Sequence, residues 1–244
     1  MQNVTTTEVR GVPMQLVTHN RALELCARMN YETEVLDFID QIPAGEVFYD
    51  LGACEGRFAL YAALRQVQCF AFEPESLNFQ AMQENIELNG ERARTFLTPY
   101  QYAVGDRSYQ TTLKIGQPWA GGHHKVIATA PSRVDLNFDF SQSQAVEVVA
   151  LDEFIAAHQL PLPDYLKVDV DGSELPFVAG AQHTLGHANL KAVIFELCKD
   201  DDSFQQIVAS LDSFGLVATQ SHQVVPGLYN IVFAKRQQVG ARSA

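Results

Sequence analysis

The stretch that most constrains the fold is residues 47–58, where an apolar segment leads into an acidic residue and then into a turn with two glycines. Asp50 is followed by Gly52 and Gly56 in a D-x-G-x-x-x-G pattern, and the apolar start of a helix comes next. Only glycine adopts positive φ, or lets a ligand approach the backbone, without steric cost. This order predicts the first strand-turn-helix unit of an open α/β sheet, with a ligand facing the turn.

The spacing differs from the G-x-G-x-x-G of dinucleotide-binding proteins, in which the helix N-terminus is open to a pyrophosphate. The carboxylate of Asp50 would repel a diphosphate, but it could hold an ammonium group. S-adenosylmethionine carries an ammonium group and a ribose and has no phosphate. It is therefore the cofactor that we expect.

A second acidic residue supports this cofactor. Residues 68–72 form an apolar run that predicts the second strand, and Glu73 follows it directly. An acidic side chain about 20 residues beyond the glycine turn is placed to accept hydrogen bonds from ribose hydroxyls. Glu73 would also select against a 2′-phosphate.

Four motifs of this chain, in order and at matching spacing, resemble those of the FkbM family of methyltransferases. They are residues 50–58, 72–74, 151–154 and 166–174. Cys54 stands where the family usually has Asn, and residues 171–174 read DGSE in place of a more usual EGAE. The resemblance implies an S-adenosylmethionine-dependent methyltransferase. Its fold would be α/β, a doubly wound Rossmann-like class I sheet of seven strands with the last one antiparallel.

The length of 244 residues and the order of the motifs predict one main domain at 46–235. We expect residues 1–45 to add a strand and a helical segment packed on the core, and residues 236–244 to form a disordered tail.

Residues 108–149 interrupt the alternation of strands and helices, with period-2 patterns around a stretch rich in Gly, Pro, Ser, His and Asp. We predict an antiparallel β insertion whose loop at 116–143 is a substrate lid and forms the wall of the acceptor pocket.

Composition limits the partners. A net charge of −12 disfavours nucleic acid as a substrate, because a polyanion would bind against the overall field. No stretch approaches the roughly 20 apolar residues of a membrane helix, and residues 1–20 lack the apolar core of a signal peptide. The four cysteines show no C-x-x-C pair. We expect a cytoplasmic protein with no membrane partner, and the sequence carries no signal for an oligomeric state.

Ligands of open α/β sheets bind outside the carboxyl ends of the strands. Acidic residues fall at several such ends, and the turn at 102–105 resembles the place where related methyltransferases lay the adenine. The predicted cofactor-binding residues are Asp50, Gly52, Ala53, Gly56, Glu73, Pro74, Ala103 and Asp169. Tyr31 and Glu34 are further candidates, because the segment before the first strand often closes over the cofactor.

An alcohol acceptor needs a base to take its proton. Asp169 and Asp171 project to one face if the strand before them continues, and either could act. The alternatives are a structural or cofactor-binding role for Asp169 and a turn role for Asp171. His123 and His124 on the proposed lid are the other candidate bases, because histidine titrates near neutral pH. Their alternative is a solvated loop pair.

Asp169, Asp171 and Glu196 also form an oxygen ligand set suited to Mg²⁺ or Ca²⁺. Glu196 alternatively pairs with Lys199. A functional metal ion is therefore an alternative to the structural roles of these residues.

The predicted function is O-methylation of a hydroxyl on a small molecule or sugar, in natural-product or glycan biosynthesis. The absence of an N/D-P-P-Y/F/W motif favours O- over N-methylation. Two alternatives stay open at this point: an NAD-type oxidoreductase, despite the missing G-x-G-x-x-G, and a non-catalytic nucleoside-binding module.

Overall fold

The computed structural model describes residues 3–128, 140 and 142–236, and a seven-stranded sheet forms its centre. The strand order is β12-β13-β11-β10-β3-β4-β5. In chain order these strands are β3 (Val47–Leu51), β4 (Gln68–Phe72), β5 (Leu97–Tyr100), β10 (Tyr165–Val168), β11 (Ala192–Cys198), β12 (Leu216–Val225) and β13 (Leu228–Lys235). The strands from β11 to β5 pair in parallel, and β13 runs antiparallel to β11. The predicted doubly wound sheet with an antiparallel last strand is confirmed.

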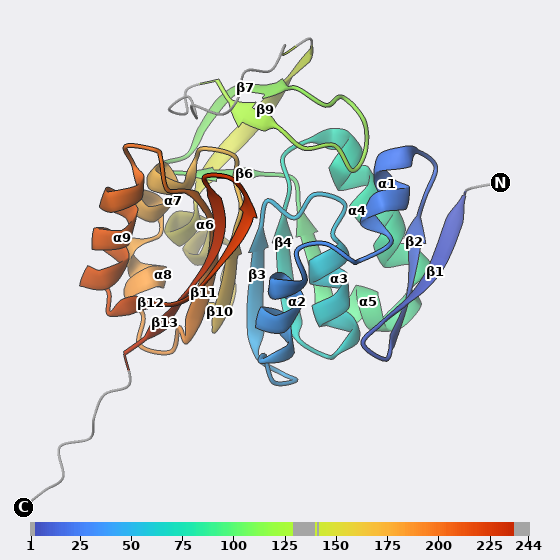
Figure 1. Ribbon diagram of the computed structural model, residues 1–244, viewed down its shortest axis with the longest axis horizontal. Coiled ribbons are helices and arrows are strands. Elements are labelled where there is room, and N and C mark those ends of the chain that lie inside the picture. The colour runs from blue at the N-terminus through green and yellow to red at the C-terminus, as the bar shows by residue number, and fades with distance from the viewer. Residues whose placement is uncertain (1–2, 129–139, 141, 237–244) are drawn as a thin grey trace, which may run out of the picture.

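Helices cover both faces of this sheet (Figure 1). One layer holds α2 (Thr33–Asp40), α3 (Arg57–Leu64), α4 (Ser76–Leu88) and α5 (Gly90–Phe96), and the other holds α6 (Leu151–His158), α7 (Glu174–Gly180), α8 (Gln182–Gly186) and α9 (Phe204–Ser213). Successive strand residues point to opposite faces. Phe48 therefore packs in the core with Phe38 of α2, whereas Tyr49 packs in the second core with Phe154 of α6.

The N-terminal segment forms a hairpin of β1 (Val4–Val9) and β2 (Val12–Val17), followed by α1 (Arg21–Cys26). Two asparagines of the α4 region hold the hairpin: Val17 N–H donates to Asn85 Oδ1 at 2.8 Å, and Gln15 N–H to Asn89 Oδ1 at 2.9 Å. No helix in the described part of the chain is both long and apolar enough to cross a membrane.

The insertion forms a second sheet that lies across one end of the central sheet (Figure 1). The insertion supplies β7 (Tyr109–Ile115), β8 (Lys125–Ile127) and β9 (Gln142–Ala150). β6 (Ala103–Gly105), just before the insertion, completes this sheet in the order β6-β9-β7-β8. β7 is antiparallel to both β8 and β9, whereas β6 pairs with β9 in parallel. The predicted lid at 116–143 lies partly outside the described residues, and so does the predicted tail from residue 237 on.

Taken by itself, the sequence at 95–104 predicts a single third strand, but residues 90–105 form α5, β5 and β6. Gly90 has φ +70°, which lets the chain turn after α4 and begin α5, whose Ala93 is fully buried. β5 then joins the central sheet, and β6 joins the insertion sheet. The predicted strand is therefore the end of a helix followed by strands of two different sheets.

Candidate active site

A pocket lies where the central sheet reverses its strand order, at the carboxyl ends of β3 and β10. The chain runs from β3 to β4 and β5 on one side, and from β10 to β11 on the other. Such switch points are where open α/β sheets bind ligands. The pocket holds about 790 Å³ of empty space, part of it open to solvent, and residues of the insertion line it together with the strand ends.

The two glycines of the turn are required by the packing of the chain itself. Gly52 has φ +77°, and a Cβ there would lie 1.8 Å from the carbonyl oxygen of Asp169. Gly56 has φ +80°, and a Cβ there would lie 2.5 Å from Cγ of Met82. Gly52 and its neighbour Ala53 line the pocket, whereas Gly56 is not among the lining residues and serves as the N-cap of α3.

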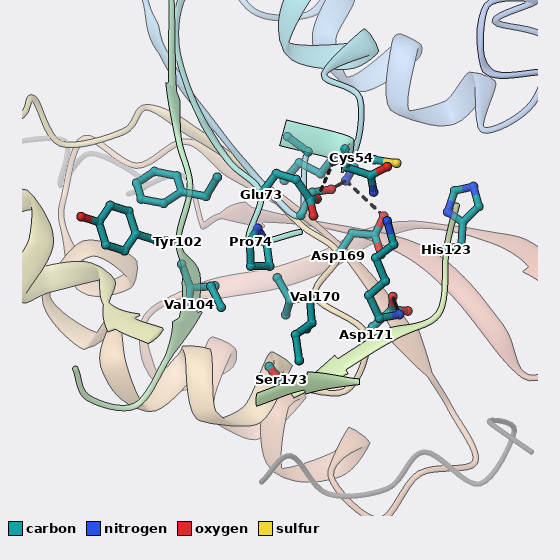
Figure 2. Close-up of a pocket in the computed structure, with 18 of the residues that line it drawn as sticks. Cys54, Glu73, Pro74, Tyr102, Val104, His123, Asp169, Val170, Asp171 and Ser173 are labelled. Carbon is teal, nitrogen blue, oxygen red and sulfur yellow. Dashed lines mark hydrogen bonds and ion pairs between the residues drawn. The ribbon is translucent and has the colours of Figure 1, made fainter. Parts of the chain in front are cut away.

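Glu73 reaches the pocket directly after β4, and its side chain is buried. Its Oε2 accepts the Cys54 N–H at 2.9 Å (Figure 2). Its Oε1 accepts the Glu75 N–H, also at 2.9 Å. A carboxylate has about four acceptor sites, so two remain for a ligand. Burial raises the pKa of Glu73 to about 7.

Asp50 does not line the pocket. It is fully buried beneath it and is paired in register with Lys167 of the neighbouring strand β10. The Lys167 Nζ lies 3.4 Å from Asp50 Oδ1, 3.1 Å from Asp169 Oδ2 and 3.3 Å from the Gly52 carbonyl oxygen. Burial raises the pKa of Asp50, and the charge of Lys167 opposes that rise. The ammonium group beside Asp50 is thus that of Lys167, and a direct contact of Asp50 with a ligand stays a prediction.

Asp169 and Asp171 both line the pocket, but they do not share the face of a strand as the sequence analysis supposed. β10 ends at Val168, so the alternation of a strand does not apply to them. Asp169 pairs with Lys167. Asp171 has φ +46°, and its Oδ2 accepts the backbone N–H of Lys125 at 3.1 Å. The two carboxylates therefore have different partners.

The predicted metal set of Asp169, Asp171 and Glu196 also differs from the group that the structure assembles. Asp169 and Glu196 lie with Glu32 instead, with one carboxylate oxygen of each within 4.8 Å of the others. Asp171 is not part of this group because it turns toward Lys125. Within this group Glu32 pairs with Arg57 and Asp169 pairs with Lys167.

Glu32 reaches the pocket from the segment between α1 and α2. The side chain of Arg57, at the start of α3, is 4% exposed and pairs with Glu32 and with Glu55. Tyr31 packs against Arg57 with 4.6 Å from the guanidinium carbon to the ring centroid, and Glu34 accepts a hydrogen bond from Asn230 at 2.9 Å. Neither Tyr31 nor Glu34 lines the pocket, so Glu32 is the acidic residue that this segment supplies.

The pocket has an aromatic end and a charged end. Figure 2 shows Tyr102 and Val104 at one end and His123 at the other, with Glu73 and Asp169 between them. Pro74 and Ala103, two of the predicted cofactor-binding residues, also line it. His123 is exposed and lines the pocket, whereas His124 is not among the lining residues and its carbonyl oxygen accepts the Gly116 N–H at 2.9 Å.

Several charged and polar residues of this pocket were not predicted from the sequence. They are Glu32, Arg57, Asn78, Lys125 and Lys167. Lys167 could have been predicted to pair with a carboxylate, because it lies inside the otherwise apolar segment 165–168 and a buried lysine needs such a partner. The ion pair of Lys125 could not be predicted from a local pattern, because its partner Glu75 is 50 residues away in the chain.

The model of the methyltransferase FkbM domain matches residues 50–220 of this chain. The chain belongs to the FkbM methyltransferase family. The FkbM match includes the strand ends that line the pocket, from Gly52 after β3 to Asp171 after β10, and it agrees with the resemblance noted in the sequence.

Two curated proteins are similar to this FkbM chain. The hexuronic acid methyltransferase AglP of Haloferax volcanii is 25% identical over 155 residues, which cover 64% of this chain and 58% of that protein. The 31-O-demethyl-FK506 methyltransferase FkbM of Streptomyces tacrolimicus is 26% identical over 212 residues, which cover 75% of this chain and 81% of that protein. This chain thus spans little more than half the length of AglP.

A solved structure supports the fold of this FkbM chain. The precorrin-6y C5,15-methyltransferase of Geobacter metallireducens superposes with a TM-score of 0.50 and 10% identity, covering 94% of each chain. At this identity the likeness concerns the fold alone, which is the class I methyltransferase fold.

Proposed function

We propose that this chain transfers the methyl group of S-adenosylmethionine to a hydroxyl oxygen of a small molecule or sugar. The observation that carries the proposal is Glu73, a buried carboxylate at the end of β4 with half of its acceptor sites unused, in a chain of the FkbM family. Glu73 would accept both ribose hydroxyls, and the aromatic end at Phe72 and Tyr102 would take the adenine. When bound, S-adenosylmethionine supplies an electrophilic methyl group on a sulfonium.

The charges around the pocket support a cationic cofactor and an uncharged acceptor. The lining carboxylates are Glu32, Glu73, Asp169 and Asp171, and the lining cations are Arg57, Lys125 and Lys167. The cations also pair with Asp50, Glu55 and Glu75 just outside the lining. Carboxylates remain in excess over cations even when Asp50 and Glu73, whose pKa values are raised, carry a proton. This excess of negative charge creates an electrostatic field in the pocket that repels an anionic acceptor.

The names of the relatives support the acceptor class. One is called a hexuronic acid methyltransferase and the other a 31-O-demethyl-FK506 methyltransferase. Both names are consistent with an oxygen acceptor on a sugar or a small molecule. A hexuronic acid carries a carboxylate at neutral pH, so the uncharged acceptor proposed for this chain differs in charge from the acceptor in that name. A place in glycan or natural-product biosynthesis follows as part of the proposal.

Methyl transfer needs the acceptor oxygen in line with the methyl group, and positioning supplies most of the acceleration. The chain would hold the acceptor between Asp169 and His123, at the charged end of the pocket. Asp169 is fixed by Lys167 at the end of a buried strand, so it is the better placed group to accept the hydroxyl proton. His123 is the alternative base.

The direct test is turnover with S-adenosylmethionine that carries an isotopically labelled methyl group. Incubation with a metabolite extract should add one labelled methyl group to an acceptor, detected by mass spectrometry. We expect turnover to persist in a metal chelator, because Glu32 and Asp169 already pair with cations. Loss of turnover in chelator, restored by Mg²⁺ or Ca²⁺, would instead support the metal ion. Binding without any turnover would favour the non-catalytic module.

Glu73→Ala should weaken S-adenosylmethionine binding by about 2–4 kcal/mol, the worth of one or two hydrogen bonds to a charged group. Calorimetry at pH 8 would measure the affinity, with Glu73→Gln as a control that keeps the size and one acceptor oxygen. Because Glu73 also accepts the N–H groups of Cys54 and Glu75, the alanine variant should lose some thermal stability too. Unchanged affinity in Glu73→Ala would remove Glu73 from the cofactor site.

A further inference from the structure

Lys125 is a buried cation that belongs to the insertion but contacts the cofactor half of the pocket. It begins β8, its side chain is 6% exposed, and its Nζ lies 2.7 Å from Oε2 of Glu75. Its backbone N–H donates to Asp171. Lys125 therefore connects the turn after β4 with the turn after β10, across the pocket that both line.

Other contacts hold the insertion at the same turn. Gln144 of β9 donates to the Pro74 carbonyl oxygen and accepts the Ser76 N–H, each at 3.0 Å. Asn78 of α4 accepts the Gly121 N–H at 2.8 Å and donates to the Gly122 carbonyl oxygen at 3.2 Å. The position of the Lys125 ammonium relative to the turn is thus fixed from both sides.

Glu75 brings the charge of Lys125 close to Glu73. Glu75 is the N-cap of α4, where its carboxylate accepts the N–H groups of Leu77 and Asn78, and its own N–H donates to Glu73. Two buried carboxylates therefore stand two residues apart in one turn. The charged groups that act on Glu73 from its surroundings are Glu75, which raises its pKa, and Lys125, which lowers it. The Cys54 thiol also lies nearby, but burial holds its pKa well above the usual value.

We propose that Lys125 is a positioning residue of the cofactor site, which balances the charge of Glu75 and so keeps Glu73 in the carboxylate form that accepts the ribose hydroxyls. The insertion would then be part of the cofactor site, because it supplies the charge on which ribose binding depends. This inference rests on the proposed function for its ligand. The effect on Glu73 itself needs no ligand.

A charge cycle of four proteins tests the inference: the wild type, Lys125→Met, Glu75→Gln and the double variant. Affinity for S-adenosylmethionine is measured by calorimetry from pH 5.5 to pH 9. In the wild type the affinity should fall as the pH drops through about 7, the pKa of Glu73, because the protonated side chain accepts fewer hydrogen bonds. In Lys125→Met the midpoint of this fall in affinity should move to higher pH. Binding at pH 7 should then be at least about tenfold weaker. Glu75→Gln should move it to lower pH, and the double variant should return it toward the wild type.

Two further variants separate a charge effect from a packing effect. Lys125→Arg keeps the charge and should keep the wild-type midpoint. Lys114→Met makes the same substitution at an exposed residue of β7, opposite Val126 of β8, and should change nothing. If Lys125→Met weakens binding equally at every pH, or if Lys125→Met and Glu75→Gln shift the midpoint in the same direction, Lys125 is only a packing residue and the inference is overturned.

Carboxyl ¹³C NMR of the protein without cofactor follows the titration of Glu73 directly, with Glu73→Gln identifying its signal. In these NMR titrations the midpoint of Glu73 should lie highest in Lys125→Met and lowest in Glu75→Gln, with the wild type and the double variant between them. A wild type that fails to bind S-adenosylmethionine but shows this order would overturn the proposed function and leave the charge coupling intact. Binding of the cofactor with identical Glu73 midpoints in all four proteins would overturn the coupling alone.

Discussion

Replacing Asp169 with asparagine should lower kcat for methyl transfer by about 10²–10⁴, the usual contribution of a general base. Asp169 lines the pocket, and its carboxylate is fixed 3.1 Å from the Lys167 ammonium at the end of β10. The amide keeps the size of the carboxylate and one acceptor oxygen, but it cannot take a proton from a hydroxyl. Binding of S-adenosylmethionine should change far less than kcat, which single-turnover kinetics and calorimetry would show separately.

Two control variants make this result specific. Asp171→Asn removes the same charge two residues further on, where the carboxylate accepts the Lys125 N–H, so we expect a smaller loss. His123→Ala removes the alternative base at the charged end of the pocket, and His124→Ala removes a residue that is not in the lining. If His123→Ala is inactive while Asp169→Asn keeps its kcat, the base is the histidine, and Asp169 only holds Lys167 in place.

Lys167→Met should lower the free energy of unfolding by about 3–5 kcal/mol, the usual cost of removing one partner from a buried ion pair. The substitution leaves Asp50, which is fully buried, without its cation. Chemical denaturation would measure the loss. Lys191→Met is the matched control, because Lys191 is 45% exposed and pairs with Glu46 at the surface, where such pairs contribute at most about 1 kcal/mol.

The pH dependence of this loss identifies Asp50 as its cause. Burial raises the pKa of Asp50 in the folded state, and removal of Lys167 takes away the charge that opposes this rise. A carboxyl whose pKa is raised by folding destabilises the protein above its unfolded pKa, so the loss in Lys167→Met should be larger at pH 8 than at pH 5. The double variant Asp50→Asn/Lys167→Met should recover part of the stability. A loss that does not change with pH would mean that packing, not charge, causes it.

Local patterns were sufficient for β3 and β4, the glycine turn and the position of Glu73. Strands of this sheet are buried on both faces, so they appear in the sequence as short apolar runs, and the residues that follow them meet at one edge. Just beyond the strand ends, the alternation of a strand no longer predicts where side chains point. Asp169 and Asp171 were assigned to one face, but β10 stops at Val168, and the backbone of Asp171 turns to positive φ.

In the insertion, too, the sequence predicted the strands but not all of the residues that they meet. Its period-2 pattern predicted antiparallel strands and a lid over the acceptor, and five of its described residues do line the pocket, among them Leu113, Lys125 and Ile127. They line it together with Glu73, at the predicted cofactor site. Shortening the loop at 116–143 would therefore act on the cofactor site as well as on the acceptor, which the sequence alone did not indicate.

The sequence by itself determined what local backbone chemistry can specify: the α/β alternation, the glycines that permit the turn, and the acidic residue that follows β4. Tertiary structure alone decided which charges meet. Lys167 pairs with Asp50 across 117 positions of the chain, Lys125 with Glu75 across 50, and Glu32 with Arg57 across 25. A buried ion takes its partner from whichever element the fold packs against it, and that neighbour has no fixed spacing in the sequence.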